Sequence, residues 1–181
     1  GRRKCQSQLY RQYASRMLGV CMRYTTDRAS AEDILQDGFM KVFSNIGSFR
    51  GEGSLEGWIR RIMVNTALTA FKATRKQGFA TDIDEMEDHL AQDDGAEGGD
   101  TEGIFNELQP DEIMELIRQL PEGYRMVLNL YVFEGATHKD IAEELGIAEN
   151  TSKSQLSKAR RFLRRRAELH LKEKQDIPIL R

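Results

Sequence analysis

Apolar residues recur at three- and four-residue steps over two separate stretches of the chain, which is the spacing of helices that each bury one face. Over the first stretch this spacing predicts three helices, at residues 9–24, 30–46 and 54–76. Ser30 and Ser54 have the positions of capping residues, and Ser30 is followed three residues later by an acid, as in a capping box. We expect these helices to form one small bundle.

The second stretch begins at Pro110 and predicts a short amphipathic helix that ends at Pro121, where another helix begins. Val127, Leu128 and Tyr131 line the apolar side of that next helix. Strand signals are weak throughout, because no stretch alternates apolar and polar residues over more than a few positions beside turn residues. The predicted fold class is therefore all-α, with two small helical modules.

The second stretch also contains a pattern that is more specific than helical periodicity. Thr137 and Asp140 have the spacing of a capping box, and Gly146 stops the helix that they open. A further helix starts within four residues and runs from about Ala148 to beyond Arg166. Helix, glycine-bearing turn and helix form the helix-turn-helix arrangement, whose second helix enters the major groove of DNA.

On a helical wheel, this last helix separates a core-facing side from a polar and basic side. The core-facing side holds Ser152, Leu156, Ala159 and Leu163. The polar side and its flanks hold Asn150, Thr151, Lys153, Ser154, Ser157, Lys158, Arg161 and Arg165. Amides and hydroxyls suit base edges, and cations suit phosphates. The alternative is a solvated amphipathic helix, but the preceding capped helix and turn favour DNA binding.

Charge is segregated along the chain although the net charge is only −2. Residues 1–76, 77–117 and 118–181 carry net charges of +8, −14 and +4, counted from their Lys, Arg, Asp and Glu. Residues 77–109 are rich in carboxylates and glycine and poor in apolar residues, a composition that does not sustain a packed core. We therefore predict an acidic flexible linker at 77–109, with modules at 1–76 and 110–181 facing a polyanion.

Two surfaces of the first module could bind partners. Its third helix combines Trp58 with Arg60, Arg61, Lys72, Arg75 and Lys76, after a loop that carries Phe49 and Arg50. Aromatic rings among cations are typical of sites for single-stranded nucleic acid, although both rings could equally be core residues. Its second helix has a polar side formed by Asp33, Gln36, Asp37 and Lys41, which is either solvated or a protein-docking face.

Several classes of function are not expected. No apolar run approaches the roughly 20 residues that cross a bilayer, and a polar segment follows the basic N-terminus where a signal peptide would be apolar. Cys5 and Cys21 lack metal-ligand spacing, so a reducing cytoplasm is the expected compartment. His89, His138 and His170 are dispersed and form no nucleophile-and-base constellation, so neither an enzyme nor a cofactor is expected.

Specific motifs stand at the predicted positions in both modules. They are AEDILQDGF at 31–39 followed by Val42 and Phe43, WIRRI at 58–62 with Phe49 before it and Asn65 after it, LPE at 120–122, HKDIAEELGI at 138–147, TSKS at 151–154 and KAR at 158–160. In this order they resemble the extracytoplasmic-function group of bacterial sigma factors, the two-module initiation subunits of RNA polymerase. Three residues depart from the pattern of that group: Thr69 for a frequent Asp, Ser152 for a usual Val, and Ala148 for a common capping Ser.

The resemblance implies roles for the candidate residues. The clamp of core RNA polymerase would bind Asp33, Gln36, Asp37 and Lys41, and the helix-turn-helix would read the minus-thirty-five element as duplex. The opened minus-ten strand would be held by a pocket at Ser48, Phe49, Arg50 and Gly51, by Trp58, Arg61 and Asn65, and by Lys72, Arg75 and Lys76 on upstream phosphates. The resemblance also implies an anti-sigma factor that binds both modules.

Two questions remain open at the level of the sequence. A conventional helix-turn-helix regulator is the alternative to a sigma factor, and it would bind duplex DNA tightly without polymerase, usually as a symmetric dimer. The chain shows no heptad seam for such a dimer. The acidic linker would either thread the polymerase interior, as the resemblance implies, or keep two basic modules soluble and apart.

Overall fold

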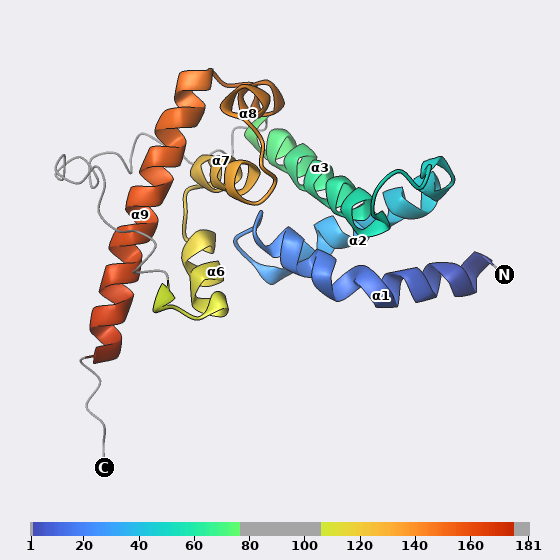
Figure 1. The fold of residues 1–181 in the computed structure, drawn as a ribbon, viewed down its shortest axis with the longest axis horizontal. Coiled ribbons are helices and arrows are strands. Elements are labelled where there is room, and N and C mark those ends of the chain that lie inside the picture. Colours follow the sequence, from blue (N-terminus) through green and yellow to red (C-terminus); the bar gives the residue numbers. More distant parts are fainter. Residues whose placement is uncertain (1, 77–105, 176–181) are drawn as a thin grey trace, which may run out of the picture. The chain divides into compact units, whose positions relative to one another are not determined.

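The computed structural model describes residues 2–76 and 106–175, which belong to two compact units, Gly1–Ala80 and Thr81–Arg181 (Figure 1). All regular elements within these described ranges are helices, which confirms the predicted all-α class. None of the helices in the described ranges is long and apolar enough to cross a membrane. Most of the predicted acidic linker falls outside the described residues.

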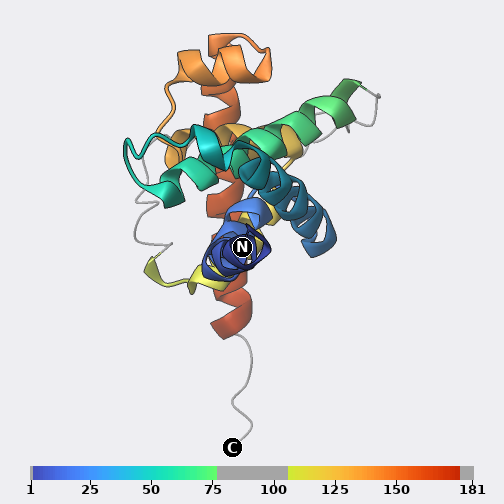
Figure 2. The same ribbon diagram turned by 90° about the vertical axis from the view of Figure 1, so that its right-hand side faces the viewer.

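The N-terminal unit contains three long helices, α1 (Arg2–Met22), α2 (Arg28–Asn45) and α3 (Leu55–Lys76), with the short 3-10 helix η1 (Ile46–Ser48) after α2. Each long helix packs against the other two (Figures 1 and 2). Their apolar stripes meet in a core formed mainly by Met17, Val20, Cys21, Tyr24, Leu35, Phe39, Val42, Ile59, Met63, Leu68 and Phe71. Burial of this apolar surface holds the bundle together, at about 25 cal/mol per Å².

The caps of α2 and α3 differ in how well the sequence predicted them. The predicted capping role of Ser30 is wrong, because Asp27 caps α2 and its carboxylate accepts hydrogen bonds from the Ser30 amide at 2.8 Å and the Ser30 hydroxyl at 2.7 Å. These bonds lower the pKa of Asp27. The predicted cap of α3 is confirmed, since the Ser54 hydroxyl accepts from the Gly57 amide at 3.0 Å.

Gly38 lets α2 and α3 approach each other closely. A β-carbon at this position would overlap the thioether of Met63, which is fully buried. A side chain at Gly38 would therefore require the Met63 thioether to move, and an extra carbon in a filled core is usually destabilising.

The C-terminal unit contains α6 (Pro110–Arg118), α7 (Glu122–Val132), α8 (His138–Leu145) and α9 (Glu149–Gln175). The long α9 packs against each of the other three helices, chiefly α7 and α8. The core of the C-terminal unit is formed mainly by Leu116, Ile117, Leu120, Tyr124, Met126, Val127, Leu130, Ile141, Leu145, Leu156, Ala159, Phe162 and Leu163. Leu108 is also buried, so packing in this unit begins before the predicted start at Pro110.

A buried arginine joins α6 to α7. Arg125 is 2% exposed, and its guanidinium donates hydrogen bonds to the carbonyl oxygens of Arg118 at 2.9 Å and Leu120 at 3.1 Å. These carbonyls lie at the C-terminal end of α6, where backbone acceptors lack helical partners. Burial lowers the pKa of Arg125, while the carboxylate of Glu122 opposes that shift.

Glu112 ties the beginning of α6 to the end of α9. Its carboxylate binds His170 Nε2 at 2.9 Å and the ammonium of Lys174, and it also accepts from the Gln109 amide at 2.8 Å. These hydrogen bonds lower the pKa of Glu112 to about 2. The charged form of Glu112 is therefore favoured by the folded state.

This contact predicts a specific acid sensitivity. A carboxylate whose folded pKa is lowered contributes stability above its unfolded pKa, near 4.5, and loses that contribution as the pH falls toward about 2. We expect Glu112→Gln to lower the Tm at pH 7, and the difference from wild type to shrink below pH 4.5 and disappear near pH 2. Thermal unfolding followed by circular dichroism at a series of pH values measures this.

Glu115→Gln is the matched control, because among the described residues Glu115 pairs only with Arg118 on its own helix, at 3.3 Å, and so joins no two of the described helices. Its difference from wild type should stay small at every pH. If the curves of Glu112→Gln and wild type stay parallel from pH 7 to 2, Glu112 does not supply the expected acid-sensitive stability.

Candidate nucleic-acid interface

The helix-turn-helix is built by the capping residues that the sequence indicated. The Asp140 amide donates to the Thr137 hydroxyl at 3.2 Å and the Thr137 amide donates to the Asp140 carboxylate at 3.0 Å, so both bonds of the capping box are present. The Thr137 hydroxyl also donates to the Asp140 carboxylate at 2.6 Å, and the bonds from the Thr137 hydroxyl and amide lower the pKa of Asp140. Gly146 ends α8 with φ 65° and ψ 42°, a left-handed conformation that favours glycine. The Ile147 amide then bonds to the Ala142 carbonyl at 3.1 Å.

A polar contact joins the two helices of the motif. Ser152 is fully buried, and its hydroxyl lies 2.9 Å from His138 Nδ1. This bond explains how the unit accommodates a hydroxyl in its core, since an unpaired buried hydroxyl would be destabilising. His138 also stacks on Tyr131, with centroids 4.8 Å apart, and the Arg160 guanidinium lies 5.7 Å from the Tyr131 centroid. Tyr131 is 37% exposed, so it packs at the edge of the unit, whereas Val127 and Leu128 on the same helix are buried.

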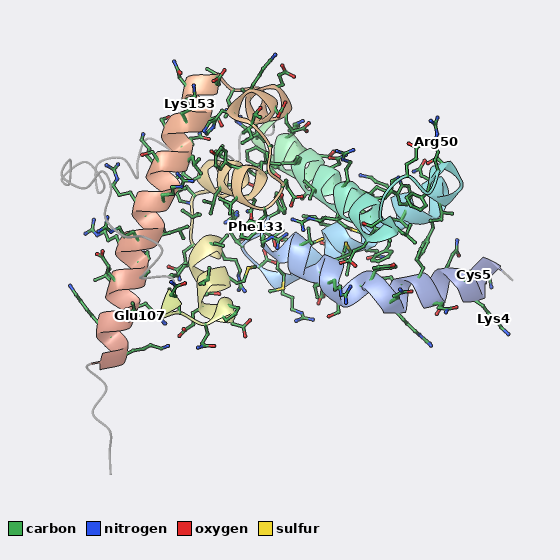
Figure 3. All side chains as sticks on the ribbon, in the orientation of Figure 1. Lys4, Cys5, Arg50, Glu107, Phe133 and Lys153 are labelled. Atoms are coloured by element: carbon green, nitrogen blue, oxygen red, sulfur yellow. The ribbon has the colours of Figure 1, made fainter. Side chains whose placement is uncertain are left out.

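The predicted recognition face of α9 is most open in its first half. Asn150, Lys153, Ser154, Ser157 and Arg165 are exposed, whereas Thr151, Lys158 and Arg161 are half-buried. Figure 3 places Lys153 at the end of α9 that adjoins α8. The opposite side of the helix, Ser152, Leu156, Ala159 and Leu163, is buried as predicted.

Two contacts arrange side chains within this face. Lys153 forms an ion pair with Glu149 at 2.7 Å, which lowers the pKa of Glu149, and the Ser154 hydroxyl donates to the Thr151 carbonyl at 3.0 Å. Ala148, just before the helix, offers no side-chain acceptor to the first turn. A missing cap of this kind costs a helix about 1 kcal/mol.

The second candidate surface lies at the loop between α2 and α3. The rings of Phe49 and Trp58 have centroids 5.6 Å apart at an angle of 48°, and both residues are half-buried. Gly51 has a φ of 76° in this loop, and Figure 3 shows Arg50 at the outer edge of it. Ser48 is exposed, and its hydroxyl donates to the Asn45 carbonyl at 2.7 Å.

Side chains of α3 continue this surface away from the aromatic pair. Trp58, Arg61 and Asn65 are three and four residues apart, so they share one side of the helix. Arg61 and Asn65 are exposed, and within the described ranges their side chains have no hydrogen-bond or ion-pair partner. At the end of α3, Lys72 is half-buried and Arg75 exposed, while the side chain of Lys76 lies outside the described part.

The polar side of α2 forms a third candidate surface. Asp33, Gln36 and Asp37 are exposed and, in the part of the chain that the structure describes, unpaired. Lys41 differs, because its ammonium donates to the Thr66 hydroxyl on α3 at 3.1 Å and is thereby held against the bundle. Met40, which the sequence pattern did not single out, is 62% exposed beside Gln36 and Asp37. Met40 lies opposite the buried stripe of α2, and this position in the helical pattern could have identified it as exposed.

The two free cysteines differ in their exposure. Cys21 is buried, and burial raises its pKa to about 12, so it stays protonated at neutral pH. Cys5 is exposed and unpaired. Over residues 2–76 and 106–175, no three His, Cys, Asp or Glu side chains are grouped to hold a metal ion.

Family models match both units. Residues 9–77 match sigma-70 region 2, and residues 111–163 match sigma-70 region 4. The chain is 31% identical to the RNA polymerase sigma-H factor of Pseudomonas aeruginosa over 152 residues, which cover 82% of this chain and 78% of that protein. It is 30% identical to the ECF RNA polymerase sigma-E factor of Haemophilus influenzae over 167 residues, covering 90% and 87%.

A solved structure of the sigma factor RpoE in complex with the anti-sigma factor NepR, from Bartonella quintana, is also similar, with a TM-score of 0.49 and 22% identity. The similarity covers 88% of this chain and 94% of that chain. Two helical units, one with a helix-turn-helix, and matches to both sigma-70 regions define a DNA-binding protein of transcription initiation. The chain belongs to the extracytoplasmic-function sigma factors, and it directs RNA polymerase to promoters.

Proposed function

We propose that this sigma factor reads the minus-thirty-five element as duplex with α9 and captures the opened minus-ten strand with the loop between α2 and α3. The observation that carries the proposal is that Arg61 and Asn65 are exposed, have no side-chain partner among the described residues, and share one side of α3 with Trp58, whose half-buried ring pairs with that of Phe49. Opening a promoter costs base pairing and stacking, which aromatic surfaces and backbone contacts can offset.

For the duplex element, Asn150, Ser154 and Ser157 are assigned to base edges. Amide and hydroxyl side chains near the start of a recognition helix reach those edges in the major groove. Lys153, Lys158, Arg161 and Arg165 are assigned to phosphates, together with Thr151 at the flank. Upstream of the opened strand, Lys72, Arg75 and Lys76 are assigned to phosphates as well.

Core RNA polymerase is proposed to dock on the exposed side of α2, through Asp33, Gln36 and Asp37 with Met40 as an apolar anchor. The exposed methionine offers an adaptable apolar contact within this polar face. Lys41 is proposed to support this face from the α3 side, because Thr66 holds its ammonium there. Family membership further implies an anti-sigma factor as a partner and the cytoplasm as the place of action.

Fluorescence anisotropy with duplex and forked promoter DNA, selected from a randomised pool, tests the proposal in the presence and absence of core RNA polymerase. We expect tight selection only with core, and a preference for forked over duplex DNA. Equally tight selection of duplex by the free protein would contradict the proposal and support a conventional helix-turn-helix regulator. Repeating the binding measurement over a range of salt concentrations gives the number of phosphate contacts from the slope of log K against log salt.

A further inference from the structure

The beginning of α1 carries a basic face that none of the proposed contacts uses. Arg3, Lys4, Ser7, Gln8 and Arg11 are all exposed and line one shallow depression of the surface. Their spacing of one, three and four residues places them on one side of the helix, because side chains at these steps are neighbours.

The charge of this face is not balanced within α1. The helix contains no Asp or Glu from Arg2 to Met22. Within the described ranges, the side chains of Arg3, Lys4 and Arg11 have no ion-pair partner. Like charges on one helix face repel each other, so a polyanion bound there would remove an unfavourable interaction.

The position of the face relates it to the proposed minus-ten pocket. The short connection between α1 and α2 makes these helices antiparallel neighbours, and the rings of Tyr10 and Phe39 pair across them at 4.7 Å. Arg3 lies seven residues before Tyr10, and Ile46 lies seven residues after Phe39. With the same rise per residue in both helices, the first turn of α1 lies level with η1, where the pocket loop begins.

Figures 1 and 3 show the same position of the start of α1 relative to the loop between α2 and α3. In Figure 3, Lys4 and Arg50 lie at the same end of the N-terminal unit and point to opposite sides of it, and Figure 1, in the same orientation, shows α1 starting at the end where α2 passes into the loop. Lys72 and Arg75, assigned above to upstream phosphates, lie at the far end of α3, about 20 residues and 30 Å along the helix from the loop.

We propose that the face formed by Arg3, Lys4, Ser7, Gln8 and Arg11 binds the sugar–phosphate backbone of the promoter strand where it leaves the minus-ten pocket on the side away from Lys72. Three cations with a hydroxyl and an amide, and no apolar side chain among them, match a phosphate backbone. A protein partner would require apolar or aromatic anchors at the centre of its interface. The inference rests on the proposed function, because it extends the same strand-binding surface.

The test compares wild type with the triple variant Arg3→Gln, Lys4→Gln and Arg11→Gln, each bound to core RNA polymerase. Glutamine keeps the helix propensity and removes the charge. The probe is forked promoter DNA whose single strand either continues past the pocket or ends at it. On the continuing strand we expect affinity to fall by about tenfold or more at 0.1 M salt, and the slope of log K against log salt to become less steep by about 2, as for three single-strand phosphate contacts.

Two controls test whether the loss of positive charge, and not another effect of the substitutions, changes the affinity for DNA. Arg3→Lys with Arg11→Lys keeps every charge and should keep the wild-type salt slope. On the strand that ends at the pocket, the triple variant and wild type should bind equally.

Three outcomes would overturn the inference. The first is an unchanged affinity and slope for the triple variant on the continuing strand. The second is a loss of core affinity with an unchanged DNA slope, which would assign the face to an acidic protein surface. If wild type with core shows no preference for forked DNA at all, the proposed function fails and the inference fails with it, an outcome visible before any variant is compared.

Discussion

Replacing Phe49 or Trp58 with alanine is expected to remove most of the affinity of the polymerase-bound sigma factor for DNA with an open minus-ten strand. Stacking of one base on an aromatic side chain contributes about 1–3 kcal/mol, which corresponds to about five- to 150-fold in affinity. The two rings lie 5.6 Å apart at the loop, so a base held by one ring also contacts the neighbourhood of the other. The double variant should therefore lose less than the sum of the single losses.

Anisotropy with forked DNA measures the loss, and permanganate reactivity of unpaired thymines on duplex promoters measures strand opening. Binding of a duplex that carries only the minus-thirty-five element should be unchanged, because that contact belongs to α9. Trp58→Phe is the matched control, since it keeps an aromatic ring at the same position of α3.

The same experiment addresses whether the rings are ordinary core residues, which the sequence pattern left open. Both residues are half-buried, so each ring packs against the protein with one part of its surface and leaves another part accessible to a base. A core role would show as a lowered Tm of the alanine variants with forked-DNA affinity intact below the transition. That combination would contradict the assignment of the pocket.

Reversing the charge of Asp37 is expected to weaken binding to core RNA polymerase by at least about tenfold. Like charges brought together at an interface cost several kcal/mol, and Asp37 has no intramolecular partner among the described residues that would compensate. We expect Asp37→Lys to have the larger effect and Asp37→Asn a smaller one, because the amide removes attraction without adding repulsion. Core affinity measured by anisotropy of labelled sigma factor gives both values.

Glu143→Lys, on the exposed side of α8, makes the same change in net charge in the other unit and should leave core affinity nearly unchanged. Helicity should be unchanged in all three variants, because Asp37 and Glu143 lie on solvent-facing sides of their helices. If Asp37→Lys binds core as tightly as wild type, the exposed side of α2 is not the docking face.

Local features of the sequence were sufficient to predict the described helices and several of their ends, but the predicted start of the first helix at residue 9 is wrong, because α1 begins at Arg2. Thr137, Asp140 and Gly146 predicted the motif of α8 because capping boxes and left-handed stops depend on residues within one turn of each other. The buried side of α9 followed from periodicity for the same reason: a helix imposes its 3.6-residue period on every side chain. The segregation of charge into modules and a linker was likewise a property of the chain alone.

Contacts between distant residues could not be predicted this way. Nothing in the sequence around Glu112 marks this residue as the partner of His170, which is 58 residues away on α9. Ser152 is a fully buried polar residue, and only the fold brings His138 to its hydroxyl.

The sequence by itself determined the helical class, the helix-turn-helix, the polar and basic faces and the family, because each depends on short-range spacing and on residue type. The tertiary structure decided which members of those faces are available to a partner. It holds Lys41 against Thr66, leaves Met40 exposed, and half-buries Arg161. The physical reason is that exposure and pairing depend on which helices pack together, and packing joins residues that are far apart along the chain.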